Sequence, residues 1–148
     1  MITYICKIDN GQEIRFEVDL DRDESAHSGP HPEWTDLPFQ QCDNCPLDTT
    51  THSHCPAALD LKEIAERFST LMSYGEVDVT VITAERNYYK RCDVQTALSS
   101  LFGLVLATSA CPILARLKSL AIFHLPFASL EETIFRTASA YLLKQYFL

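Results

Sequence analysis

The feature that most constrains this chain is the stretch from residue 21 to residue 54, which has neither the alternation of a strand nor the period of a helix. It contains four of the seven prolines, four of the five histidines and the pair Cys42 and Cys45. Structureless loops of this length are uncommon in compact domains, and this one has too few apolar residues to order itself. We therefore expect a metal to hold it.

Regular patterns flank this stretch on both sides. Residues 2–20 alternate between apolar and polar side chains around a turn at residues 9–12, which predicts a β-hairpin. A third strand is predicted at residues 77–83 by the same alternation. Helical patterns follow at residues 56–75 and 93–109, then in a short helix that ends near Phe123 and in a last helix.

The last helix opens at Ser129, where Glu132 completes a capping box, and it runs through Tyr146 without a stop signal. The absence of that signal is compatible with a natural chain that continues further.

The order of these elements predicts one α+β domain over residues 1–148. Strands come first and helices dominate afterwards, which favours a small antiparallel sheet with four helices packed on one face. The sheet would consist of the N-terminal hairpin and one further strand. A metal-binding loop at about residues 34–56 would then join the sheet to a helical half at about residues 93–148.

Four cysteines form the strongest chemical pattern: Cys42, Cys45, Cys55 and Cys111. Two cysteines separated by two residues can direct both sulfurs at one ion from a single turn. Cys55 and Cys111 each precede a proline that suits a helix start, where the helix dipole favours a thiolate. We therefore predict one four-cysteine metal centre, and we expect Cys6 and Cys92 to be structural.

The pattern leaves the metal open between two main alternatives. One cysteine pair with two scattered Cys-Pro dipeptides favours an iron–sulfur cluster, because four-cysteine zinc sites usually contain two close pairs. A compact zinc site would instead use Cys42, Cys45, His52 and Cys55. A chain without metal is the third possibility, with Cys42 and Cys45 as a redox dithiol or as inert thiols.

Three stretches of the chain resemble a family of small bacterial proteins of unknown function. The first contains Cys42-Asp-Asn-Cys45-Pro and leads to Cys55-Pro, and the second is Thr108-Ser-Ala-Cys111-Pro. The third is Phe123-His-Leu-Pro-Phe127 with the following pair of glutamates. The resemblance implies no activity, because the family has none assigned, but it places the Cys-Pro sites in one pattern.

A second chemical cluster combines His124 with Glu131 near the start of the last helix. A histidine beside a carboxylate could serve as an acid–base pair, which makes a small enzyme an alternative function. The simpler interpretation is structural: Glu132 caps its own helix and pairs with Arg136.

Charge and hydropathy exclude other classes of function. The net charge is −8, and residues 1–60 carry twelve acidic against three basic residues, which argues against nucleic acid and leaves a basic protein partner possible. The uncharged stretch from Val94 to Ala115 is long enough to span a membrane, but its many hydroxyl side chains and Pro112 favour a buried helix. No signal peptide is visible, so we expect a cytoplasmic protein with reduced thiols.

Overall fold

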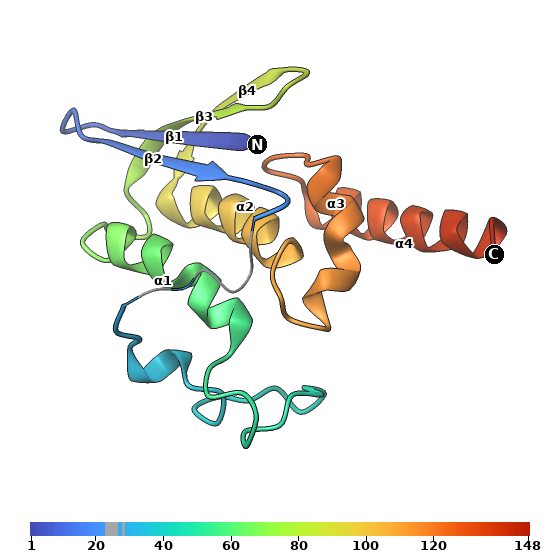
Figure 1. Ribbon diagram of the computed structural model, residues 1–148. Helices are drawn as coiled ribbons and strands as arrows, with labels where there is room; N and C mark the ends of the chain where they lie inside the picture. The colour runs from blue at the N-terminus through green and yellow to red at the C-terminus, as the bar shows by residue number, and fades with distance from the viewer. Residues whose placement is uncertain (23–26, 28) are drawn as a thin grey trace.

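A computed structural model describes residues 1–22, 27 and 29–148. The centre of this described part is one antiparallel sheet of four strands in the order β2-β1-β3-β4, with one α-helix between β2 and β3 and the others after β4, so the α+β class is confirmed (Figure 1). The strands are β1 (Ile2–Ile8), β2 (Glu13–Val18), β3 (Glu76–Ile82) and β4 (Asn87–Asp93).

The N-terminal hairpin forms as its alternation predicts. Ile2 pairs with Val18, and Cys6 pairs with Ile14 on one side and with Val79 of β3 on the other. Most apolar residues at alternate positions of β1, β2 and β3 are buried, and most residues between them are more exposed, so one face of the sheet carries the core. Gly11 makes the hairpin turn with a φ of +87°, a conformation that favours glycine.

The sequence predicted one strand after the hairpin, and the structure has two. β4 pairs along its whole length with β3 in a second hairpin. Only Tyr88 and Cys92 of β4 are half-buried, and its other side chains are exposed. An edge strand with one solvated face therefore has too weak an apolar alternation to be recognised from its sequence.

The described residues contain four α-helices: α1 (Pro56–Phe68), α2 (Val94–Ala107), α3 (Lys118–Ile122) and α4 (Leu130–Tyr146). Short 3-10 helices occupy Glu33–Thr35 and Leu114–Leu117. α2 is the central helix, because it contacts β3, β4, α1 and α3 and buries Leu101 and Leu104 completely. α1 ends at Phe68, earlier than predicted, and residues 69–75 form turns.

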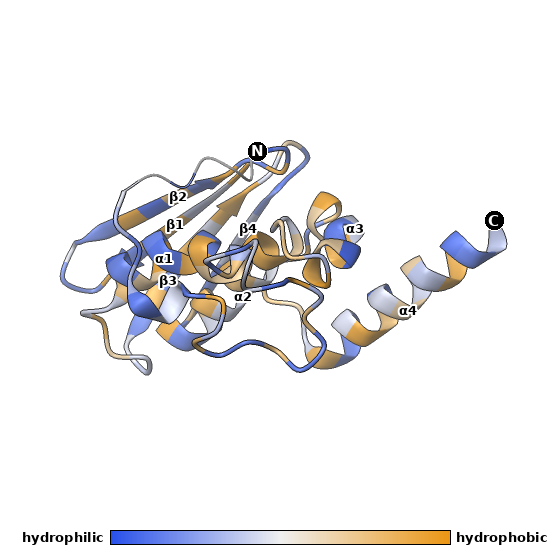
Figure 2. Ribbon diagram, turned by 60° about the horizontal axis from the view of Figure 1, so that its bottom comes forward, coloured by the Kyte–Doolittle hydropathy of each residue, from blue (hydrophilic) through white to orange (hydrophobic). Residues whose placement is uncertain are grey.

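The prediction that four helices pack on one face of the sheet fails for α4. None of its residues is buried, and the element that it contacts most is α3 rather than a strand. Figures 1 and 2 show the helix leaving the body, with its C-terminal end far from the sheet. Its apolar residues gave it a helical pattern, but that pattern does not say what the apolar face packs against.

The apolar stretch that raised the question of a membrane span is divided in the structure. α2 covers its first part, and residues 108–113 then form turns before the next 3-10 helix. No helix in the described part of the chain has both the length and the apolar character needed to cross a bilayer.

Candidate functional site

Two of the predicted thiolate ligands lie in one tight turn. The backbone N–H of Cys45 donates to the carbonyl of Cys42 at 2.9 Å, which is the compact turn that the two-residue spacing predicts. Cys42 is exposed, Cys45 is half-buried, and neither forms a disulfide. Both sulfurs are therefore within reach of an incoming ion.

Cys55 occupies the N-cap of α1, as predicted from the following proline. Pro56 is the first helical residue, and Cys55 has the extended conformation of an N-cap, with φ −75° and ψ 119°. Its thiol makes no capping hydrogen bond, so the sulfur is left for another partner at the positive end of the helix dipole.

The loop of residues 38–53 is attached to the rest of the fold at both of its ends. Thr35 and Leu37 are buried at one end, and the N–H of Cys55 donates to the carbonyl of Thr35 at 2.7 Å at the other. Asp36 and His54 also form an isolated bridge. None of residues 38–53 is buried, so apolar packing does not fix them.

Cys111 lies near the start of a short helix, but not at its N-cap. It is half-buried just after α2, with its N–H donating to Ser109 Oγ at 3.0 Å. The N-cap of the next 3-10 helix is Ile113, two residues after Cys111, and the carbonyl of Cys111 accepts the N–H of Ala115 at 2.9 Å. A turn at Pro112 and Ile113 comes first. Within the described ranges, no three His, Cys, Asp or Glu side chains form a group ready to hold a metal.

The loop histidines contain a contact that sequence reasoning missed. The rings of His31 and His54 lie edge to face with centroids 4.8 Å apart, and His54 Nδ1 is 3.0 Å from a carboxylate oxygen of Asp36. Desolvation, and then the proximity of His54, lowers the pKa of His31. His52, the alternative zinc ligand, is exposed, with Nδ1 2.9 Å from the hydroxyl of Thr51.

Cys6 and Cys92 have the surroundings expected of structural thiols. Cys6 is 1% exposed in the core, and burial raises its pKa to about 12, which keeps it protonated. Cys92 is half-buried against the same core, and burial raises its pKa as well.

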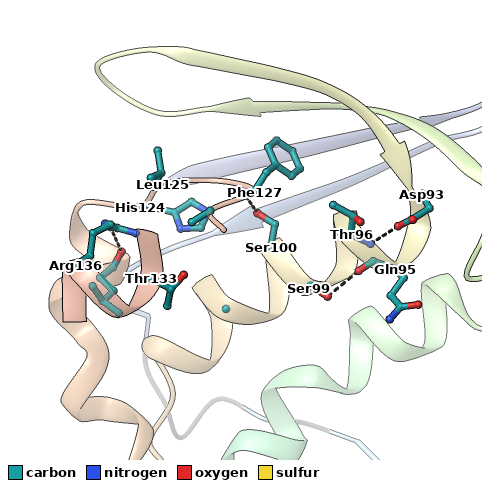
Figure 3. A pocket seen from close by; sticks show the side chains of 13 residues that line it. Asp93, Gln95, Thr96, Ser99, Ser100, His124, Leu125, Phe127, Thr133 and Arg136 are labelled. Atoms are coloured by element: carbon teal, nitrogen blue, oxygen red, sulfur yellow. Dashed lines mark hydrogen bonds between the residues drawn. The ribbon is translucent and has the colours of Figure 1, made fainter. Parts of the chain in front are cut away.

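A pocket of about 460 Å³ lies beside α2, far along the chain from the cysteine loop (Figure 3). His124, which the sequence singled out, lines it together with Ser100, Phe127 and Arg136. Behind His124, the buried hydroxyl of Tyr4 lies 2.5 Å from His124 Nε2 and 2.7 Å from Ser100 Oγ. Ser100 Oγ also accepts the N–H of Phe127 at 3.0 Å.

The protonation states in this pocket follow from burial. Burial, and then the charge of Arg136, lowers the pKa of His124 to about 4, so the imidazole is neutral at pH 7. Burial also raises the pKa of the Tyr4 hydroxyl, which stays protonated. The proton of Tyr4 can therefore go to a neutral Nε2, with Ser100 donating to Tyr4, and His124 then carries its own proton on Nδ1.

Arg136 brings a positive charge to the same pocket. Its guanidinium donates to the carbonyls of Leu120 and Phe123, at the end of α3. Among the described residues no carboxylate lies within ion-pair distance of Arg136, so the predicted pairing with Glu132 does not form. Glu132 instead completes the predicted capping box with Ser129.

Glu131 does not line the pocket that contains His124. It is exposed, and it is not among the residues that line the pocket, whereas Thr133 and Arg136 of the same helix are. The carboxylate that does line the pocket is Asp93, which caps α2 by accepting the N–H of Thr96 at 2.6 Å. Phe127 adopts a φ of +60°, which is uncommon for a residue other than glycine.

Neither the curated proteins nor the solved structures contain a match to this chain. The predicted resemblance to an uncharacterised family is confirmed, however, because one family matches almost the whole sequence. The chain belongs to the family described as a domain of unknown function, DUF6901, which matches residues 2–148.

Proposed function

We propose that this chain is a metal-binding protein in which Cys42, Cys45 and Cys55 supply thiolate ligands and the metal orders the loop between them. The observation that carries this proposal is that residues 38–53 include no buried residue, although both ends of the loop are fixed. Binding of a metal between Cys42, Cys45 and Cys55 would give the loop the constraint that apolar packing does not.

The accessibility of the thiols supports this proposal. Cys42 is exposed, Cys45 and Cys55 are half-buried, and all three are free. The turn at Cys42 and Cys45 presents two sulfurs from adjacent positions, and the N-cap position of Cys55 favours its thiolate form. The ligand set would then be assembled by the ion, since it is not preformed.

The fourth ligand decides the nature of the centre. With Cys111 the set is four thiolates, which suits an iron–sulfur cluster that would serve electron transfer, sensing or architecture. With His52 it is three thiolates and one imidazole, which suits structural zinc in a protein-interaction module. The His52 set lies within one continuous segment, whereas Cys111 follows α2, so the cluster would join the loop to the helical half.

The test is elemental analysis of anaerobically purified protein, together with its absorbance spectrum. A cluster gives iron and sulfide with broad absorbance near roughly 400 nm, and the zinc site gives one equivalent of zinc without colour. Cys42→Ser, Cys45→Ser and Cys55→Ser should each lower the metal content. Cys111→Ser should do so only for the cluster, and His52→Ala only for the zinc site.

Cys92→Ala is the matched control, because Cys92 is half-buried on β4 and outside the loop. It should retain the full metal content. If the three loop variants hold as much metal as the Cys92 variant, the thiolate centre does not exist.

A second candidate function is the binding of a small carboxylate-bearing molecule in the pocket at His124. Arg136 has only neutral carbonyl partners in the described chain, so its charge remains available to an anion. The Nδ1–H of His124 would add a donor, and Leu120 and Phe127 offer apolar contact. An enzyme that pairs His124 with Glu131 would additionally need Glu131 to reach this pocket.

Phenylacetate and phenylacetamide form a matched pair of probes for this pocket, because they differ in charge and not in shape. We expect phenylacetate alone to shift the amide resonances of Ser100, His124 and Phe127 in a two-dimensional NMR titration. Equal shifts with both probes would contradict an anion site.

A further inference from the structure

Helix α4 exposes a set of large apolar side chains that the fold leaves uncovered. In Figure 2 the helix projects from the body with apolar residues along its length. Phe135 is 73% exposed and Leu142 is 65% exposed, values far above those of the core. The other large apolar side chains of this set are Leu130, Ile134, Tyr141, Leu143 and Tyr146.

All of these side chains except Leu143 share one face of the helix. With 3.6 residues per turn, Ile134, Phe135, Tyr141 and Leu142 surround Ala138, which is also exposed. The half-buried Arg136 and Ala140 lie on the opposite side of the helix, which faces the body. The exposed face is therefore an apolar surface with its smallest residue at the centre.

We propose that this face binds a second copy of the same chain, with the two α4 helices antiparallel and crossing at Ala138. In that arrangement Ile134 and Phe135 of each copy face Tyr141 and Leu142 of the other. The small side chain of Ala138 lets the two helices approach closely at the crossing point. A two-fold interface requires such self-complementarity, because the same patch must serve both partners.

The polar residues of α4 favour the antiparallel orientation. Glu131 and Gln145 also lie on the exposed face, one near each end of the helix. The antiparallel pair places Glu131 of one copy against Gln145 of the other, and it brings Lys144 to the acidic end. A parallel pair would instead place the two copies of Glu131 together and align the helix dipoles.

The charges of the chain favour a protein partner over a lipid surface. The net charge is −8, and α4 carries only Arg136 and Lys144 as cations. Arg136 is turned to the body, where it donates to the carbonyls of Leu120 and Phe123. Helices that lie on membranes usually have a polar face rich in lysine and arginine, which α4 lacks.

The size of the helix sets the strength of the dimer. A helix of 17 residues is about 25 Å long, so the helix pair alone buries an area at the low end of specific interfaces. We therefore expect a monomer–dimer equilibrium that depends on concentration.

Sedimentation of the full chain over a range of concentrations tests the interface. Ile134→Glu should raise the dissociation constant of the dimer by roughly tenfold or more, because it buries an unpaired charge. Tyr74→Glu is the control, since Tyr74 is 76% exposed in a turn away from α4 and its replacement should leave the dimer unchanged.

A charge exchange tests the orientation. Gln145→Glu should weaken the dimer by placing two carboxylates together, and adding Glu131→Lys should restore it by forming a salt bridge between copies. Within one chain these positions are about 21 Å apart along the helix, so a rescue can only occur between molecules. A parallel pair would place like charges together at both ends in the double variant, which would then not recover.

Three results would overturn the proposal. One is a chain that stays monomeric at every concentration, and another is a dimer that Ile134→Glu leaves intact. The third is a monomer that co-sediments with phosphatidylcholine vesicles through α4, which would assign the apolar face to a membrane. Far-UV circular dichroism of each variant checks that α4 remains helical.

Discussion

Tyr4 connects the core of the sheet to the pocket through a single hydroxyl group. The side chain is fully buried, and its hydroxyl contacts both Ser100 and His124. Buried polar groups that lose a partner cost more than the net value of the lost hydrogen bond, because the remaining group stays desolvated. This one hydroxyl is therefore a shared hydrogen-bond partner of two half-buried polar side chains.

Replacement of Tyr4 by phenylalanine should destabilise the protein by about 1–3 kcal/mol, since it leaves Ser100 and His124 without this partner. Urea unfolding of the variant measures the change. Tyr89→Phe is the control. The Tyr89 hydroxyl also makes a hydrogen bond, donating to Asp78 at 2.6 Å, but its side chain is 68% exposed. That variant should differ from the wild type by less than about 0.5 kcal/mol.

His124 should make stability depend on pH. Burial lowers its folded-state pKa from 6.5 to about 4. Between these pH values the unfolded chain binds a proton that the folded chain does not, so the free energy of unfolding falls as the pH falls through this window. The stability that the neutral histidine contributes is fully present above pH 6.5. Roughly 3 kcal/mol of it is lost once the pH has fallen through the folded-state pKa.

The measurement is the free energy of unfolding of wild type and His124→Gln between pH 4 and pH 7.5. Glutamine does not titrate, so the difference between the two curves isolates the histidine from the carboxylates. The wild-type curve should be steeper below pH 6.5. Parallel curves would mean that His124 titrates normally in the folded protein.

At the scale of elements, α2 depends on a cap that also borders the pocket. The carboxylate of Asp93 accepts the N–H of Thr96 at 2.6 Å, and this hydrogen bond lowers the pKa of Asp93. Asp93→Ala should cost about 1 kcal/mol of stability, whereas Asp93→Asn retains a capping oxygen and should cost less. Thermal unfolding of the two variants at pH 7 distinguishes them, and equal losses would argue that the cap contributes little.

Elements with strong local signals were predictable from the sequence. The hairpin of β1 and β2 has a clean alternation, and the start of α4 has a complete capping box that the structure confirms. β4 was missed because only Tyr88 and Cys92 mark its inner side. Its strand conformation depends on pairing with β3, which is tertiary information.

The candidate sites show the same limit. The turn at Cys42 and Cys45 and the N-cap at Cys55 follow from local spacing, so both were predictable. The approach of Tyr4 and Ser100 to His124 joins three distant parts of the chain, and no periodicity predicts it. Pro112 correctly marked a nearby helix start for Cys111, whereas the distance of Cys111 from the cysteine loop depends on tertiary packing.

At the scale of the whole molecule, stability is distributed unevenly. The core is built from the sheet, α1 and α2, with a single buried residue from α3. The loop of residues 38–53 and helix α4 contribute no buried residue to it. Segments with few buried contacts open locally at a small fraction of the global unfolding free energy. Two parts of the chain are therefore expected to behave independently of the core.

Amide hydrogen exchange should resolve this division and separate the two proposals. In dilute, metal-free protein, the amides of β1, β3 and α2 should be protected longest, and those of α4 and residues 38–53 should exchange first. A higher protein concentration should protect α4 alone, because it drives the pairing of helices. Reconstitution with the metal should protect residues 38–53 alone, because ligand binding stabilises only the segment that it orders. Protection that spread from either segment into the other would show that the loop and the helix are coupled through the core.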